Sequence, residues 1–173
     1  MKPYAQIKTA KENLLLAAAE WAAVKNGLIT KKNLPDVVNW TLDSGETVNI
    51  TTTVENSQLE LYFTNQLRAA FAISYIQADT ALEQVFGKQR LEDEDSDRRA
   101  SRCIIYMLRC SLAHNPLEPV WVCNRGFREC FSVKAIDFTL DIRNLDGEPV
   151  SWEQFGGIPK YFGLLDYCES LVK

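Results

Sequence analysis

The sequence lacks most of the features that mark metal sites, cofactor sites and membrane spans. It has one histidine and five cysteines, none of them in a Cys-x-x-Cys pair, so we expect no bound metal and no disulfide framework. Gly-x-Gly-x-x-Gly, Gly-x4-Gly-Lys and Gly-x-Ser-x-Gly are all absent, so we expect no nucleotide cofactor and no hydrolase of the nucleophile-elbow type. No apolar run is long enough to span a bilayer, and the first residues lack the apolar core of a signal peptide. We therefore expect a cytoplasmic protein with no membrane partner.

An excess of positive charge is also lacking. The formal net charge is -4 and the pI is about 5.1, so the molecule as a whole does not have the basic composition typical of nucleic-acid-binding proteins. Only the local distribution of charge can decide whether a basic surface exists. With 173 residues, of which 46% are hydrophobic, the chain is expected to fold as one domain with a sizeable core.

Apolar residues recurring at helical spacing predict four helices. Gly27 and Gly87 supply stop signals after the first two helices. Pro116 ends the third helix, because proline disfavours the helical conformation in the residue before it. The predicted helices span residues 5–26, 57–87, 97–113 and 158–172.

Two stretches between these helices are predicted to be extended. Ser44-Gly45 is a turn pair between Trp40 and Thr47, which predicts a small hairpin. Further on, the predicted strands are 119–124, 127–131 and 135–143, with a turn at Arg125-Gly126 after the first. The fold class is therefore α+β and mainly helical. A helical core of about residues 5–116 plus 158–172 and a β-rich segment of about 119–143 together make a single domain over 1–173.

An acidic run precedes the third predicted helix. Carboxylates of residues 91–97 favour the positive end of the helix dipole, and Ser96 or Asp97 is expected to cap it. The arginines that follow, Arg98, Arg99 and Arg102, have two interpretations. They could pair with these acids or with Asp79 and Glu83 of the long helix, or they could form part of a basic surface.

Arg109 and His114 form the pair of residues with the clearest chemical potential. His114 is the only histidine, so any acid–base role of a group that titrates near neutral pH falls on it. An arginine supplies a permanent cation that holds phosphate oxygens in a bidentate manner. If the helix unwinds before Pro116, the His114 ring can approach Arg109.

The Arg109-x4-His114 pattern at a helix end resembles the Arg-x4–6-His motif of the HEPN superfamily. That family consists of compact helical domains, commonly dimers, and many members are metal-independent endoribonucleases of toxin–antitoxin, CRISPR and other defence systems. The resemblance implies a HEPN-like antiparallel helical core with a small β-sheet insertion before the last helix. It also implies a homodimer, with Arg109 as the phosphate clamp and His114 as the acid–base group or a phosphate ligand.

A basic face would extend such a site toward RNA. Arg98, Arg102, Arg125 and Arg128 are the arginines that we expect to contact phosphates of an RNA partner. A second hypothesis from a different class is a non-catalytic α+β module that binds a protein or an RNA through its arginine face or a sheet edge. Under that hypothesis His114 only stabilises the negative end of its helix, and the arginines are structural.

Overall fold

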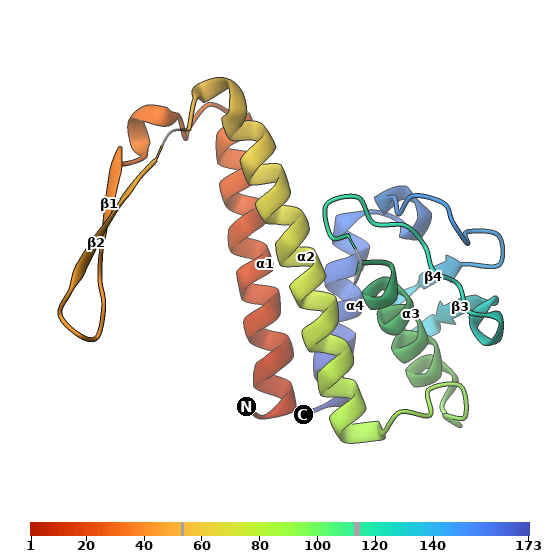
Figure 1. Cartoon of the computed structure of the whole chain (residues 1–173). Helices are drawn as coiled ribbons and strands as arrows, with labels where there is room; N and C mark the ends of the chain where they lie inside the picture. The colour runs from red at the N-terminus through yellow and green to blue at the C-terminus, as the bar shows by residue number, and fades with distance from the viewer. Residues whose placement is uncertain (53, 113–114) are drawn as a thin grey trace. The chain divides into compact units, whose positions relative to one another are not determined.

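A computed structural model describes residues 1–52, 54–112 and 115–173, apart from the side chain of Arg125. The described part is mainly helical with two small antiparallel hairpins, which confirms the predicted α+β class (Figure 1). The helices are α1 (Pro3–Lys25), α2 (Asn56–Phe86), α3 (Ser96–Leu112) and α4 (Ile158–Leu171). The strands are β1 (Val37–Thr41), β2 (Thr47–Thr51), β3 (Cys130–Val133) and β4 (Phe138–Asp141). Within these ranges no helix is both long and apolar enough to cross a membrane.

The chain forms two compact units, and we describe each by itself. The larger unit contains residues 1–15 and 68–173, and the smaller unit contains residues 16–67. The boundaries between the units fall inside α1 and α2. Whether the units fold together as the single domain predicted over residues 1–173 stays a prediction.

The core of the larger unit is built around α3. Apolar residues of this helix recur at helical spacing, and Ile104, Ile105 and Leu108 are completely buried. A second part of the core is aromatic: Phe71 on α2 lies 4.0 Å from Trp152 and 5.5 Å from Tyr161 of α4, measured between ring centroids. The Tyr161 hydroxyl is satisfied inside this cluster by a 2.7 Å hydrogen bond with the Ser74 hydroxyl. Burial of its apolar residues holds α3 in the core of this unit, and the aromatic contacts hold α2 against α4.

The β-rich segment differs from its prediction in which strands pair. Residues 119–124 do not form a strand; they make one isolated antiparallel bridge, between Val120 and Pro149. The predicted turn at Arg125-Gly126 is instead a short 3-10 helix, Arg125–Phe127, which prevents a tight hairpin with the residues that follow. The prediction was wrong because residues 147–150 already satisfy the backbone groups of residues 119–121.

Strand β3 pairs with β4 instead, with Phe131 opposite Leu140. The alternation predicted for residues 135–143 is confirmed within β4, where Phe138 and Leu140 are buried and the residues between them are exposed. The first part of that stretch is a 3-10 turn that ends at Asp137, whose φ is 48°. The predicted long strand is thereby shortened to four residues.

The cap of α3 also differs from the prediction by one residue. Asp95 Oδ1 accepts hydrogen bonds from the backbone N–H groups of Asp97 and Arg98, at 3.0 and 2.9 Å. Asp95 is therefore the N-cap, in place of the predicted Ser96 or Asp97. The Asp97 carboxylate instead accepts a 2.8 Å bond from the backbone N–H of Ala135 and so ties the start of α3 to the turn before β4.

Two glycine substitutions are expected to change stability in opposite directions. Gly87 follows α2 with φ +74°, and a Cβ at this position meets no atom within 4 Å, so Gly87→Ala adds only backbone strain, about 1 kcal/mol of destabilisation. Gly163 lies inside α4 with equally open surroundings and no positive φ, so Gly163→Ala is expected to stabilise by about 0.5–1 kcal/mol. Urea denaturation of both variants measures the two effects. A loss of stability in Gly163→Ala would contradict this account.

Candidate functional site

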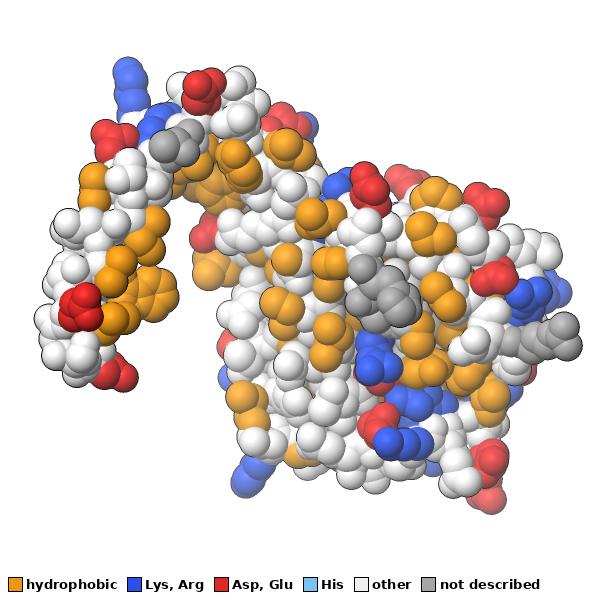
Figure 2. All heavy atoms as spheres, in the orientation of Figure 1, with side chains coloured by type: hydrophobic (Ala, Val, Ile, Leu, Met, Phe, Trp, Pro, Cys, Tyr) orange, Lys and Arg blue, Asp and Glu red, His pale blue; other side chains and the backbone are white. Residues whose placement is uncertain are grey.

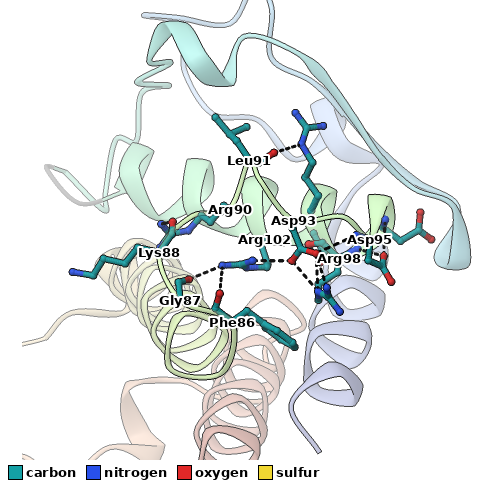
Figure 3. A network of polar contacts seen from close by, with 12 residues as sticks. Phe86, Gly87, Lys88, Arg90, Leu91, Asp93, Asp95, Arg98 and Arg102 are labelled. Atoms are coloured by element: carbon teal, nitrogen blue, oxygen red, sulfur yellow. Dashed lines mark hydrogen bonds and ion pairs between the residues drawn. The ribbon is translucent and has the colours of Figure 1, made fainter.

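The arginines at the start of α3 converge on one carboxylate, Asp93. Figure 3 shows Arg98 and Arg102 both pointing at this side chain from the helix. The ion pairs measure 2.6 Å from Arg98 Nη2 and 2.7 Å from Arg102 Nη1 to the Asp93 oxygens. Hydrogen bonds from Arg98 are the main reason why the pKa of Asp93 is lowered to about 2, and those from Arg102 add to the effect. Both arginines are therefore already committed to a carboxylate of their own chain.

Arg102 is the more deeply placed of the two. Its side chain and that of Asp93 are each 3% exposed, and its second nitrogen donates to the backbone carbonyls of Phe86 and Gly87 at the end of α2 (Figure 3). A guanidinium engaged in this way has little surface left for an RNA phosphate. Its position fits the structural alternative, in which Arg102 joins the end of α2 to α3.

The neighbouring arginines are also paired. Arg99 donates to both carboxylate oxygens of Glu129 at 3.0 Å. Arg90 pairs at 2.8 Å with Asp79 and at 2.8 Å with Glu83, and its guanidinium lies 4.3 Å from the centre of the Tyr106 ring. In this region the positive charges of the arginines are therefore largely neutralised by carboxylates of the same chain.

Arg109 has features of both predicted roles, the structural one and the phosphate-binding one. Its Nε lies 3.7 Å from a carboxylate oxygen of the buried Asp79, yet its side chain is 44% exposed. His114 and the preceding residue lie outside the described residues, so the structure does not show whether His114 comes near Arg109. The ribonuclease site formed by Arg109 and His114 stays a prediction.

The two arginines predicted to extend the basic face lie after the α3 region. Arg128 pairs with Asp146 at 2.5 Å and also donates to the Cys123 carbonyl. The side chain of Arg125 lies outside the described part of the chain. The structure therefore does not bring Arg98, Arg102 and Arg128 together as a set of unpaired cations.

The smaller unit carries a different kind of surface, the β1–β2 hairpin. Directly paired residues share a face, and the pairs Val38–Ile50 and Trp40–Val48 alternate with pairs of polar residues. We call the side formed by Val38, Trp40, Val48 and Ile50 the apolar face. The opposite face, formed by Val37, Asn39, Thr41, Thr47, Asn49 and Thr51, is polar except for Val37.

The apolar face is open to solvent along its whole length. Trp40 is 62% exposed, and the three aliphatic residues around it are 37 to 46% exposed. In Figure 2 the hydrophobic side chains of the hairpin gather along one of its sides. Because an isolated two-stranded hairpin is at best marginally stable in water, an uncovered apolar face of this kind indicates a contact surface.

Charge is distributed unevenly around this hairpin. Between Asn33 and Leu67 the chain has five acidic residues and no lysine or arginine. Two of these acids, Asp43 and Glu46, lie in the loop that joins β1 to β2 and have no ion-pair partner among the described residues. The hairpin therefore combines an apolar face with a negatively charged tip.

Sequence reasoning missed this surface as a candidate site, although the sequence carries part of its signal. Val38, Trp40 and Leu42 alternate with polar residues, and Val48 and Ile50 repeat the alternation after the turn. That pattern predicts a half-buried hairpin in the first instance. Only the structure shows that both faces are exposed.

Comparison of the chain with family models, with curated proteins and with solved structures finds no match in any of the three.

Proposed function

We propose that this protein is a non-catalytic interaction module that binds a protein partner through the apolar face of the β1–β2 hairpin. The observation that carries the proposal is that four exposed apolar side chains lie on one face of the hairpin, whose opposite face is polar except for Val37. Trp40, which lies opposite Val48 and next to the Val38–Ile50 pair, gives this face the composition of a binding hot spot, in which a few anchor residues supply most of the affinity.

The negative charge of the hairpin indicates which charge the partner's surface carries. The acids at the tip, Asp43 and Glu46, and the lack of any cation from Asn33 to Leu67 favour an apolar groove bordered by lysine or arginine. The same distribution argues against RNA as the partner of the hairpin, because RNA affinity depends on neutralising phosphates with basic residues.

The ribonuclease hypothesis has less support from the described residues. Arg98, Arg102 and Arg128 are all paired with carboxylates of the chain, and an arginine must give up such a pair before it can hold a phosphate. The side chain of Arg109 is 44% exposed, but His114, its predicted acid–base partner, lies outside the described residues. We therefore prefer the interaction module to the HEPN-like nuclease.

Two substitutions on adjacent residues of β1 test the proposal. Trp40→Asp places a charge on the apolar face, and Thr41→Asp places the same charge on the opposite face as a matched control. Tagged full-length chains of wild type and both variants are used to isolate partners from a cell extract, and each partner is then purified and titrated by calorimetry. We expect Trp40→Asp to weaken binding on the order of 30-fold or more, the loss typical of a hot spot, and Thr41→Asp to retain it.

Two results would contradict the proposal. One is a partner that binds wild type and Trp40→Asp with equal affinity. The other is binding that Trp40→Asp and Thr41→Asp reduce to the same extent, because that would show a response to charge or to a lost hairpin fold and not to one face. Circular dichroism of both variants verifies that the rest of the chain is folded.

A further inference from the structure

The larger unit contains a hollow formed by two cavities, and this hollow is independent of the hairpin. The outer cavity has a volume of about 660 Å³ and the inner cavity about 90 Å³. The two cavities share Arg68, Pro119 and Val150 as lining residues. Small-molecule sites in proteins commonly have volumes of about 300–1,000 Å³, so the outer cavity has room for a small ligand.

The walls of the outer cavity are apolar and open to solvent. Leu117, Val120 and Val122 line it, and each of these side chains is 40% exposed. Pro149 and Val150 add further apolar surface from the facing segment. A ligand that removes these large aliphatic side chains from water lowers the free energy of the complex, so their burial favours binding.

Arg68 distinguishes this hollow from an ordinary apolar surface depression. Of the arginines whose side chains the structure describes, Arg68 alone has no carboxylate within 4.0 Å; the other seven all have one. It projects from α2 and borders both cavities. An unpaired guanidinium at an apolar site is a binding group for an anion, which it holds with two parallel hydrogen bonds.

Two further polar side chains line the hollow. Asn115 lines the outer cavity, and its Oδ1 accepts bonds from the backbone N–H groups of Leu117 and Glu118, so its NH₂ group is left to donate. Tyr75 lines the inner cavity and is 1% exposed, and its hydroxyl has no hydrogen-bond partner among the described residues. Burial raises the pKa of Tyr75, which keeps this hydroxyl protonated. A buried donor without an acceptor costs free energy that a bound acceptor recovers.

The charges around the hollow limit the charge of the ligand. Glu118 also lines the outer cavity, so one cation and one carboxylate border it. A dianion such as a phosphate monoester would meet a single guanidinium and a repelling carboxylate. A carboxylate carries one charge and matches the planar guanidinium. We propose that this hollow binds an aliphatic monocarboxylate, with its head group at Arg68 and its chain along Leu117, Val120 and Val122.

Octanoate is a suitable probe, with octan-1-ol as the uncharged ligand of the same chain length and octyl phosphate as the dianion. Calorimetry on the full chain compares wild type with Arg68→Gln, and with Arg143→Gln as the matched control. Arg143 is exposed, and its partner is Asp141, two residues earlier in the chain. We expect one saturable octanoate site in wild type, weakened on the order of 10-fold or more in Arg68→Gln, as for the loss of charged hydrogen bonds. Arg143→Gln is expected to bind as wild type does.

A second variant tests the apolar wall separately from the charge. Val122→Asn, which makes the wall polar without adding a charge, is expected to weaken octanoate and octan-1-ol alike, whereas Arg68→Gln is expected to leave octan-1-ol unchanged. The proposal is overturned if octanoate shows no saturable binding, or if it binds no more tightly than octan-1-ol. It is also overturned if Arg68→Gln binds octanoate like wild type, or if octyl phosphate binds more tightly than octanoate. None of these results depends on the hairpin, so the proposed protein partner is tested independently.

Discussion

Replacing Asp93 by alanine is expected to lower the free energy of unfolding by about 3–5 kcal/mol, the cost of removing one partner from a buried ion pair. Asp93 and Arg102 are both 3% exposed, and the Arg102 guanidinium keeps only two backbone carbonyls as acceptors once the carboxylate is gone. The uncompensated charge lies at the junction of α2 and α3. We therefore expect this single change to be among the most destabilising in the larger unit.

Urea denaturation followed by circular dichroism measures this effect. Asp141→Ala is the matched control, because Asp141 also pairs with an arginine but both side chains of that pair are 45 to 59% exposed. An exposed pair contributes little to stability, because water screens the two charges. Equal effects of the two substitutions would show that the Asp93 pair is not the structural centre of this region.

The same pair predicts how stability depends on pH. The pKa of Asp93 is about 2 in the folded protein, whereas an unfolded aspartate titrates near a pKa of about 4. The Asp93 carboxylate binds a proton less readily in the folded state than in the unfolded state. The stabilisation that its ion pairs with Arg98 and Arg102 supply is therefore complete above about pH 4 and is lost as the pH falls toward about 2. The difference in unfolding free energy between wild type and Asp93→Ala should shrink across this interval. A difference independent of pH there would contradict the assignment.

Replacing Phe71 by alanine is expected to cost about 3–5 kcal/mol, as for other large aromatic residues of protein cores. Phe71 is 1% exposed, and its ring contacts Trp152, Tyr161 and Tyr75, three of the largest side chains of the larger unit. The substitution removes the ring that joins α2 to Trp152 and Tyr161, and it leaves a void beside the inner cavity that Phe71 lines.

Chemical denaturation also measures the Phe71→Ala effect, with Ile73→Ala as the control on the same helix. Ile73 is 51% exposed, so its truncation is expected to cost less than about 1 kcal/mol. If the two substitutions destabilise equally, the aromatic cluster is not a main part of the core.

The helices could be predicted from the sequence because their signals are local. Apolar residues at helical spacing, Gly87 with its positive φ and Pro159 in the first turn of α4 determine where these elements lie. The hairpin was predictable for the same reason, since Ser44-Gly45 falls in the loop between β1 and β2.

The pairing of residues distant in sequence could not be predicted in the same way. Residues 119–124 have the composition of a strand, but the backbone hydrogen bonds of residues 119–121 go to residues 147–150, which no local pattern indicates. The ion-pair partners of the arginines could not be predicted for the same reason. The pairs Arg99–Glu129 and Arg109–Asp79 each join residues 30 positions apart, and only tertiary packing decides which arginine meets which acid.

Arg68 shows the limit most clearly. In the sequence it is one basic residue on a long helix, with no motif around it that would distinguish it from the other arginines. Arg68 differs from the other arginines because no carboxylate of the described residues lies within 4.0 Å of it. The apolar segments at Pro119 and Val150 also meet beside it. The acidic residues near Arg98 and Arg102 are close in sequence, which is why pairing with them could be predicted as the structural alternative.

The claim that the apolar face of the hairpin binds a protein partner is tested most directly by site-specific photocrosslinking. A photoreactive phenylalanine analogue is placed at Ile50, on the apolar face, and separately at Asn49, its neighbour on the polar face. Irradiation in the presence of the purified partner is followed by mass spectrometry. The account predicts crosslinks to the partner from position 50 and none from position 49. Crosslinks from position 49 alone, or crosslinks from position 50 only to other parts of the same chain, would contradict it.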